Sequence, residues 1–140
     1  MKKIILSSLV LSIAFAITAK AQHSMTHEVT KTPPKLIYTK LLNNDNIKNQ
    51  EVQMVLVTYA PGESSEPHRH PIETIGYVLE GEIESTFEGK VYHYKKGDVF
   101  YETPNGLHQG TRNLSKTKEA KILAFFIGDK GKPFIVPEKK

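Results

Sequence analysis

Short apolar segments alternate with turn residues along most of the chain. From residue 36 onward, runs of Val, Ile, Leu, Phe and Tyr are brief and are separated by Gly, Pro, Asn and Asp, which turns prefer. No window keeps a helical period for more than two turns. The segments expected as strands are residues 36–42, 52–59, 74–79, 83–87, 91–94, 99–102, 107–112, 122–127 and 134–136. Short strands at regular spacing predict an all-β sandwich or barrel.

The first residues follow a different pattern, in which an apolar run has a basic start and small residues at its end. Lys2 and Lys3 precede apolar residues 4–18, and residues 19–21 read Ala-Lys-Ala. This pattern predicts a secretory signal peptide, residues 1–21, that is cleaved after Ala21. The alternative is a membrane anchor, but the run is short for a span of about 20 residues. We therefore expect an exported bacterial protein, periplasmic or secreted.

The remainder divides into a leader, one domain and a tail. Residues 22–34 are polar, lack periodicity and end in two prolines, which predicts a flexible leader. Residues 35–136 carry all the expected strands, and residues 137–140 form a short charged tail. A chain of this length can bury one core but not two, so we expect a single domain.

Charge and cysteine content exclude several classes of protein. The chain has 19 basic and 15 acidic residues. Three of the basic residues lie in the signal peptide, so the mature chain keeps 16 basic against 15 acidic residues, a net charge of +1. This balance gives no reason to expect a nucleic-acid partner, nor a membrane partner after signal removal. The chain has no cysteine, so neither disulfides nor thiolate chemistry is available.

Three histidines stand out within the β pattern. His68 and His70 lie two residues apart at the start of one expected strand, and on an extended chain two such side chains point to the same side. His108 follows a Pro-Asn-Gly turn at residues 104–106, which returns the chain to a neighbouring strand. Asn105 is a residue type that tolerates the left-handed conformation of such a turn. Imidazoles on rigid strands are suited to hold one divalent metal ion.

Two stretches carry a resemblance to a known family. Residues 61–81, PGESSEPHRHPIETIGYVLEG, resemble the first motif of the cupin superfamily, and residues 97–113, GDVFYETPNGLHQGTRN, resemble the second. The resemblance covers roughly residues 52–127. The matching positions are Gly62, His68, His70 and Gly81 in the first motif and Gly97, Pro104, Gly106, His108 and Asn113 in the second.

The resemblance implies a double-stranded β-helix, that is, a jelly-roll barrel with a metal ion at its mouth. His68, His70 and His108 would be the ligands, and the cofactor would be a divalent transition metal such as zinc, iron, manganese or nickel. The alternative is a degenerate cupin that kept the turns but binds no metal.

One position departs from the cupin pattern. The glutamate that the family uses as a ligand falls on Thr74 in this chain. Glu73 is adjacent, but alternation along a strand should turn it to the opposite face. Only a bulge after Pro71 would bring Glu73 to the site. We therefore expect a three-histidine site with Thr74 lining the pocket.

The pocket should also contain an apolar surface and one further carboxylate. Glu102 shares a strand face with Phe100, so it is either an inward carboxylate near the metal ligands or a rim residue. It is the only fair candidate for acid–base catalysis. Met54 and Phe100 are expected to supply apolar area in the pocket.

The sequence leaves two main functions open, and a purely structural role through a dimer interface is a weaker third. The first is a metal-dependent enzyme that binds a small organic molecule in the barrel, with oxygenase, isomerase or decarboxylase-type activity, as the resemblance implies. The second is a non-catalytic cupin that binds or senses a small molecule with weak or no metal. Residues 120–128, AKILAFFIG, are apolar on both faces, which indicates either double-sided burial or a homodimer contact.

Overall fold

The computed structural model describes residues 31–139, and ten β-strands run through this part of the chain without any helix. None of the described residues forms a helix long and apolar enough to cross a membrane. The expected signal peptide and leader residues 22–30 lie outside the described residues. In chain order the strands are β1 (Lys35–Leu42), β2 (Gln50–Tyr59), β3 (His68–Arg69), β4 (Glu73–Glu80), β5 (Glu82–Phe87), β6 (Lys90–Lys95), β7 (Val99–Glu102), β8 (Leu107–Asn113), β9 (Ala120–Asp129) and β10 (Val136–Pro137).

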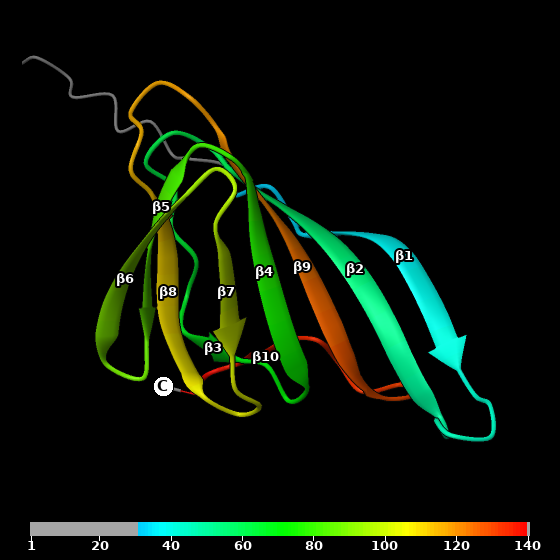
Figure 1. Cartoon of the computed structure of the whole chain (residues 1–140). Helices are drawn as coiled ribbons and strands as arrows, with labels where there is room; N and C mark the ends of the chain where they lie inside the picture. The colour runs from blue at the N-terminus through cyan, green and yellow to red at the C-terminus, as the bar shows by residue number, and fades with distance from the viewer. Residues whose placement is uncertain (1–30, 140) are drawn as a thin grey trace, which may run out of the picture.

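The strands form two five-stranded antiparallel sheets (Figure 1). One sheet has the order β1-β2-β9-β4-β7 and the other β10-β3-β8-β5-β6. Consecutive strands repeatedly change sheet, as β4 and β5 do, so the chain winds around a common interior. The all-β jelly-roll barrel predicted from the sequence is confirmed.

All nine expected strands have an observed counterpart whose ends lie within two residues of the expected ones, but one strand was missed. The sequence placed His68 and His70 at the start of the strand that is now β4. In the structure His68 belongs to a separate strand, β3, which pairs with β8 and β10 in the opposite sheet. Pro71 follows directly, and proline restricts the residue before it and offers no N–H to a ladder. The chain therefore changes sheet between β3 and β4.

Alternation along the strands builds the core between the sheets. On β4 the buried side is Thr74, Gly76 and Val78, while the residues between them are exposed. Two buried apolar clusters fill the interior. They consist of Tyr59, Val78, Ile83, Ala120 and Ile122 in one, and Val55, Ile72, Ala124 and Phe126 in the other.

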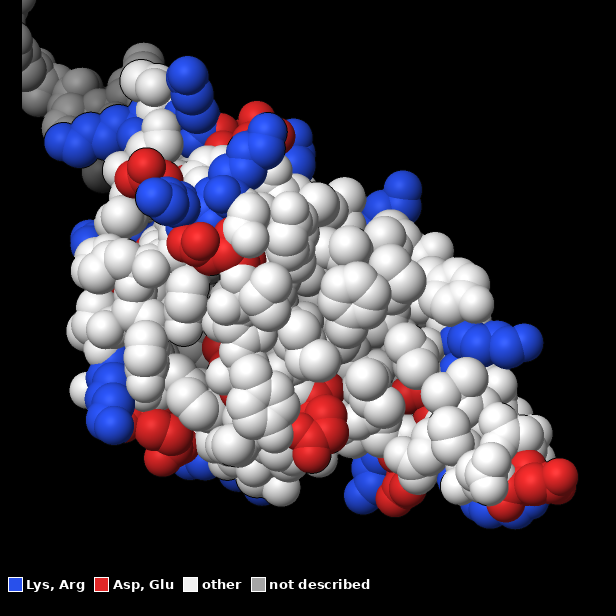
Figure 2. Space-filling model, in the orientation of Figure 1, with Lys and Arg blue, Asp and Glu red and all other residues white. Residues whose placement is uncertain are grey.

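The outer face of the first sheet is also largely apolar. Figure 2 shows a broad uncharged surface over β4, β9 and β2. On β9 the inward residues, such as Phe126, are buried, and the outward ones, such as Phe125, are half-buried. The segment that is apolar on both faces therefore has one face in the core and the other on this surface.

Both ends of the described chain make contacts with the barrel. Residues 31–34, expected in the leader, line the interior cavity described below. Pro137, expected in the tail, belongs to β10, and Glu138 accepts a 2.7 Å hydrogen bond from Arg69 Nε. The domain thus extends beyond the limits of residues 35–136.

Candidate metal centre

Pairing of β3 with β8 brings distant histidines together. His68 lies directly opposite His108 across these strands, and His70 follows β3. The three side chains are buried. One ring nitrogen from each histidine lies within 4.8 Å of the chosen nitrogens of the other two. The structure therefore assembles the three histidines that the sequence singled out into a group that could hold a metal ion.

Backbone carbonyls determine which nitrogen of two imidazoles carries the proton. His68 Nδ1 lies 2.7 Å from the carbonyl oxygen of Glu66, and His70 Nδ1 lies 2.5 Å from that of Phe134. A carbonyl oxygen can only accept, so both Nδ1 atoms donate and both Nε2 atoms keep a lone pair. These two Nε2 atoms are 3.3 Å apart. Two lone pairs that face each other at this distance suit a shared cation.

Burial also favours the neutral form that binds metals. Burial lowers the pKa of His68 to about 4, and it lowers the pKa of His70 as well. The hydrogen bonds to the two carbonyls oppose this effect but do not cancel it. At neutral pH both imidazoles are therefore free of a competing proton.

The depressed pKa of His68 predicts a pH dependence of stability for the metal-free protein. The unfolded histidine takes up a proton near pH 6.5, whereas the folded one does so only near pH 4. The free energy of unfolding should therefore fall as the pH drops through this window, by about 3 kcal/mol from His68. Urea unfolding between pH 7 and pH 4 in the presence of a chelator measures this. The dependence should be smaller in His68→Ala, and an equal dependence would contradict the assignment.

His108 has a different set of partners. Its Nε2 lies 3.1 Å from Ser85 Oγ and 2.9 Å from Thr111 Oγ1. Its Nδ1 is buried, has no hydrogen-bond partner among the described residues, and lies 3.3 Å from Glu102 Oε2. The free nitrogen of His108 therefore faces the same space as Glu102.

Glu102 points into the barrel, which settles the two alternatives that the sequence left open. It is only 3% exposed and lines the cavity. Its Oε2 lies 3.4 Å from His70 Nε2, and it sits opposite Thr74 in the pairing of β4 with β7. Thr74 is buried as well, and its hydroxyl donates to the carbonyl oxygen of Ile72 at 3.1 Å.

Glu73 lies on the other face of β4. It is exposed and accepts a 2.5 Å hydrogen bond from the hydroxyl of Tyr101. The pairing of β4 with β9 is regular at Glu73 and Thr74, so no bulge turns Glu73 inward.

Glu73→Ala should consequently leave the metal stoichiometry of the protein unchanged. The substitution removes an exposed carboxylate that faces away from the imidazoles. Elemental analysis of the variant and the wild type after identical metal loading measures this. Loss of metal in the variant would show that Glu73 reaches the site.

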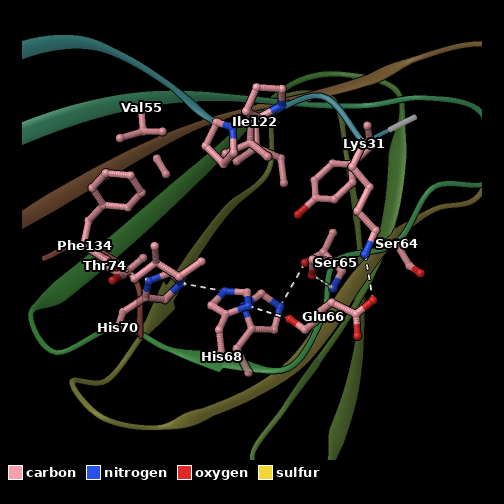
Figure 3. A pocket seen from close by; sticks show the side chains of 18 of the residues that line it. Lys31, Val55, Ser64, Ser65, Glu66, His68, His70, Thr74, Ile122 and Phe134 are labelled. Carbon is pink, nitrogen blue, oxygen red and sulfur yellow. Dashed lines mark hydrogen bonds and ion pairs between the residues drawn. The ribbon is translucent and has the colours of Figure 1, made fainter. Parts of the chain in front are cut away.

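A cavity of about 390 Å³ adjoins the histidines. Figure 3 shows His68 and His70 pointing toward one another at its wall, with Phe134 near His70. Most of its lining is apolar, as expected for a small-molecule site. Phe100 contributes to the lining of this cavity. A Cβ atom on Gly76 would lie only 2.1 Å from Cζ of the Phe100 ring, so a larger residue at position 76 would clash with the ring. A glycine at this position of β4 thus makes room for the aromatic ring.

Met54 does not line this cavity, contrary to the sequence-based expectation. Its neighbours Val55 and Val57 do, and side chains alternate along β2. Val55 takes the inward direction and is fully buried, so Met54 must point to the outer face, where it is half-buried.

Several cavity residues were not found from the sequence. Lys31 lines the cavity and forms a 2.7 Å ion pair with Glu66. Figure 3 shows this ion pair on the side of the cavity that faces away from His70. Phe134 supplies both lining and the carbonyl that orients His70. No local pattern marks these residues, because their role depends on contacts across the fold.

The Pro-Asn-Gly turn positions the histidine strand. Asn105 adopts a left-handed conformation with φ of 61°, as its residue type suggested. Its backbone N–H donates to the carbonyl oxygen of His70 at 2.7 Å, and its carbonyl oxygen accepts from Arg69 at 2.6 Å. The turn before His108 is therefore bonded directly to the segment that carries the other two histidines.

Comparison with known proteins gives the family. A family model described as a cupin domain, Cupin_2, matches residues 55–126, just over half of the chain. The chain belongs to the cupin family. Solved cupin structures agree, since an uncharacterized protein with a double-stranded β-helix domain from Klebsiella pneumoniae superposes with a TM-score of 0.60. It is 20% identical and the match covers 79% of this chain and 87% of that one, which supports the fold alone.

Other relatives share only part of their length with this cupin. The transcriptional regulator PuuR of Escherichia coli is 42% identical over 62 residues, 44% of this chain and 33% of the regulator. The pectin degradation protein KdgF of Dickeya dadantii is 34% identical over 61 residues, 43% of this chain and 56% of KdgF. A structure of oxalate oxidase is 31% identical with a TM-score of 0.52, and the match covers 61% of this chain and 45% of that one. The chain thus spans between a third and just over half of these proteins.

Proposed function

We propose that this cupin binds one divalent transition metal ion through His68, His70 and His108, together with a small organic molecule in the adjoining cavity. The observation that carries the proposal is the convergence of three buried imidazoles, two of which present unprotonated Nε2 atoms to a common space. Zinc, iron, manganese or nickel bound there would supply Lewis-acid or redox chemistry.

The cavity suggests the class of ligand. Its volume suits a molecule of modest size, and the exposed area of its lining is mainly apolar, although polar residues such as Ser65 and Thr111 also line it. A ligand with an apolar body and one or two oxygen donors directed at the histidines fits this distribution. The apolar walls would exclude water from the reacting end.

Catalysis is the first candidate activity. Oxygenase, isomerase or decarboxylase-type chemistry would use the metal site and the mainly apolar cavity together. The similarity to oxalate oxidase, at 31% identity, favours an oxidase or oxygenase among these activities. Glu102 is a buried carboxylate within reach of this space.

Sensing or storage of a small molecule is the second candidate. The 42% identity to a segment of the regulator PuuR favours it. Residues 31–139 contain no helix, so a sensing role for this chain would act through ligand binding in the barrel.

One experiment tests the metal site and then separates the two candidates. Elemental analysis of untagged protein after metal loading should give about one ion per chain, and a value at background would overturn the proposal. The loaded protein is then incubated with small organic acids and hydroxy compounds, and the mixture is analysed by mass spectrometry. Conversion of a compound identifies an enzyme, whereas a bound and unchanged compound identifies a binding protein.

We also propose export after cleavage at Ala21, on the strength of the basic start, apolar run and Ala-Lys-Ala ending of residues 1–21. N-terminal sequencing of protein from the producing cell should begin at Gln22. A sequence that begins at Met1 would overturn this.

A second copy of the chain is the partner that we propose for the edge of the first sheet. A bulge between Leu36 and Tyr38 lets β1 expose apolar side chains on both of its faces. Paired edges that bury such residues are common in homodimers. Light scattering should give twice the mass of the mature chain, and a monomer at micromolar concentration would contradict this.

A further inference from the structure

Glu102 places a carboxylate in the barrel interior without a hydrogen-bond partner for either oxygen among the described residues. The side chain is 3% exposed, and its only ion-pair neighbours within residues 31–139 are His70 and His108. A buried carboxylate without donors or a counter-charge is costly. A cation beside Glu102 would remove this cost.

The neighbours of Glu102 do not supply the missing donors. His108 Nδ1 lies 3.3 Å from Glu102 Oε2 but makes no hydrogen bond with it. His70 Nε2 is 3.4 Å away but carries no proton, because Nδ1 donates to the carbonyl oxygen of Phe134. Thr74 lies opposite Glu102 on β4, but its hydroxyl already donates to Ile72. The interior therefore presents the Glu102 carboxylate to the unprotonated Nε2 of His70.

The distances between these atoms match those between ligands of one metal ion. Atoms bound at about 2.1 Å lie about 3.0 Å apart when the angle at the metal is 90°, and about 3.4 Å apart at the tetrahedral angle. His68 Nε2 to His70 Nε2 is 3.3 Å, and His70 Nε2 to Glu102 Oε2 is 3.4 Å. Glu102 Oε2 to His108 Nδ1 is 3.3 Å. All three distances therefore fall in the range expected between ligand atoms of one metal ion.

We propose that Glu102 is the fourth protein ligand of the metal ion. The carboxylate comes from β7, at the position paired with Thr74 on β4. This inference rests on the proposed three-histidine site and deepens it. A carboxylate among imidazoles makes the site more suitable for oxygen-preferring ions such as manganese.

The test compares metal affinities of the wild type and Glu102→Gln. Glutamine keeps the shape of the side chain but removes its charge. Affinity for Mn²⁺ should fall about 100-fold, and affinity for Ni²⁺, which imidazole suits, should fall only about 10-fold. Competition with a chromogenic chelator measures both constants. Glu73→Gln is the matched control, because the carboxylate of Glu73 is exposed on the outer face of β4. This variant should bind both ions as the wild type does.

The possible results separate this inference from the proposed function. If the wild type binds neither ion, both proposals fall. If the wild type binds and Glu102→Gln has the same affinities, Glu102 is not a ligand, and the three-histidine site stands alone. An equal loss for both ions would assign Glu102 the lesser role of orienting His108 and would overturn the proposal.

Stability without metal provides an independent readout. In the presence of a chelator, Glu102→Gln should unfold at a temperature equal to or higher than that of the wild type, because it removes a buried carboxylate that makes no hydrogen bond. Added Mn²⁺ should raise the unfolding temperature of the wild type more than that of the variant. A variant that is markedly less stable without metal would show that the carboxylate serves the fold and would contradict the proposal.

Discussion

His68→Ala should reduce bound metal from about one ion per chain to background. His68 contributes a buried Nε2 atom whose direction is set by the hydrogen bond from Nδ1 to the carbonyl oxygen of Glu66. Removal of one of three imidazole ligands should lower affinity by at least about 100-fold, since even loss of the groups that orient a ligand costs 10- to 100-fold. Equilibrium dialysis followed by elemental analysis measures the loss.

Two controls make this result specific. His93→Ala removes a histidine whose side chain is 64% exposed on β6 and should leave metal content unchanged. Circular dichroism and urea unfolding of metal-free His68→Ala should show a folded barrel, because β3 contributes only two residues to its sheet. A folded His68→Ala that retains wild-type affinity would place the metal site elsewhere.

Asn113→Ala should destabilise the barrel by about 4 kcal/mol. Asn113 is 1% exposed and lies at the end of β8. Its amide nitrogen shares its two hydrogens among the backbone carbonyls of Tyr59, Ala60 and Lys118, and its side-chain oxygen accepts from the N–H of Ser115. Each buried backbone group that loses its partner costs about 1–3 kcal/mol. One side chain therefore joins the end of β2 to the loop that leads into β9.

Urea unfolding of the metal-free protein measures this effect. The midpoint should fall while the denaturant dependence stays the same. Asn44→Ala is the matched control, because the Asn44 side chain also bonds the backbone, by accepting from the N–H groups of Asn46 and Ile47, but in an exposed turn. Water can replace those hydrogen bonds, so Asn44→Ala should lower the free energy of unfolding by less than about 1 kcal/mol. Equal costs for the two variants would show that burial of the network does not matter.

The sequence by itself determined all but one of the strands, the turns and the identity of the three histidines. Alternation of apolar and polar residues is a local property, and it predicted nine of the ten strands and the outward direction of Glu73. The left-handed Asn105 was readable for the same reason, because backbone conformation depends on the residue itself and its neighbours.

Tertiary structure alone decided which groups surround the histidines. Alternation assigns a residue to one of two faces, but it does not say which face is inward, so Glu102 was undecided and Met54 was placed wrongly. The separate strand β3 was missed because two residues are too few for a pattern, and pairing with β8 defines them. The carbonyl that orients His70 belongs to Phe134, 64 residues away along the chain. Only the folding of both sheets around one interior brings such groups within hydrogen-bonding distance.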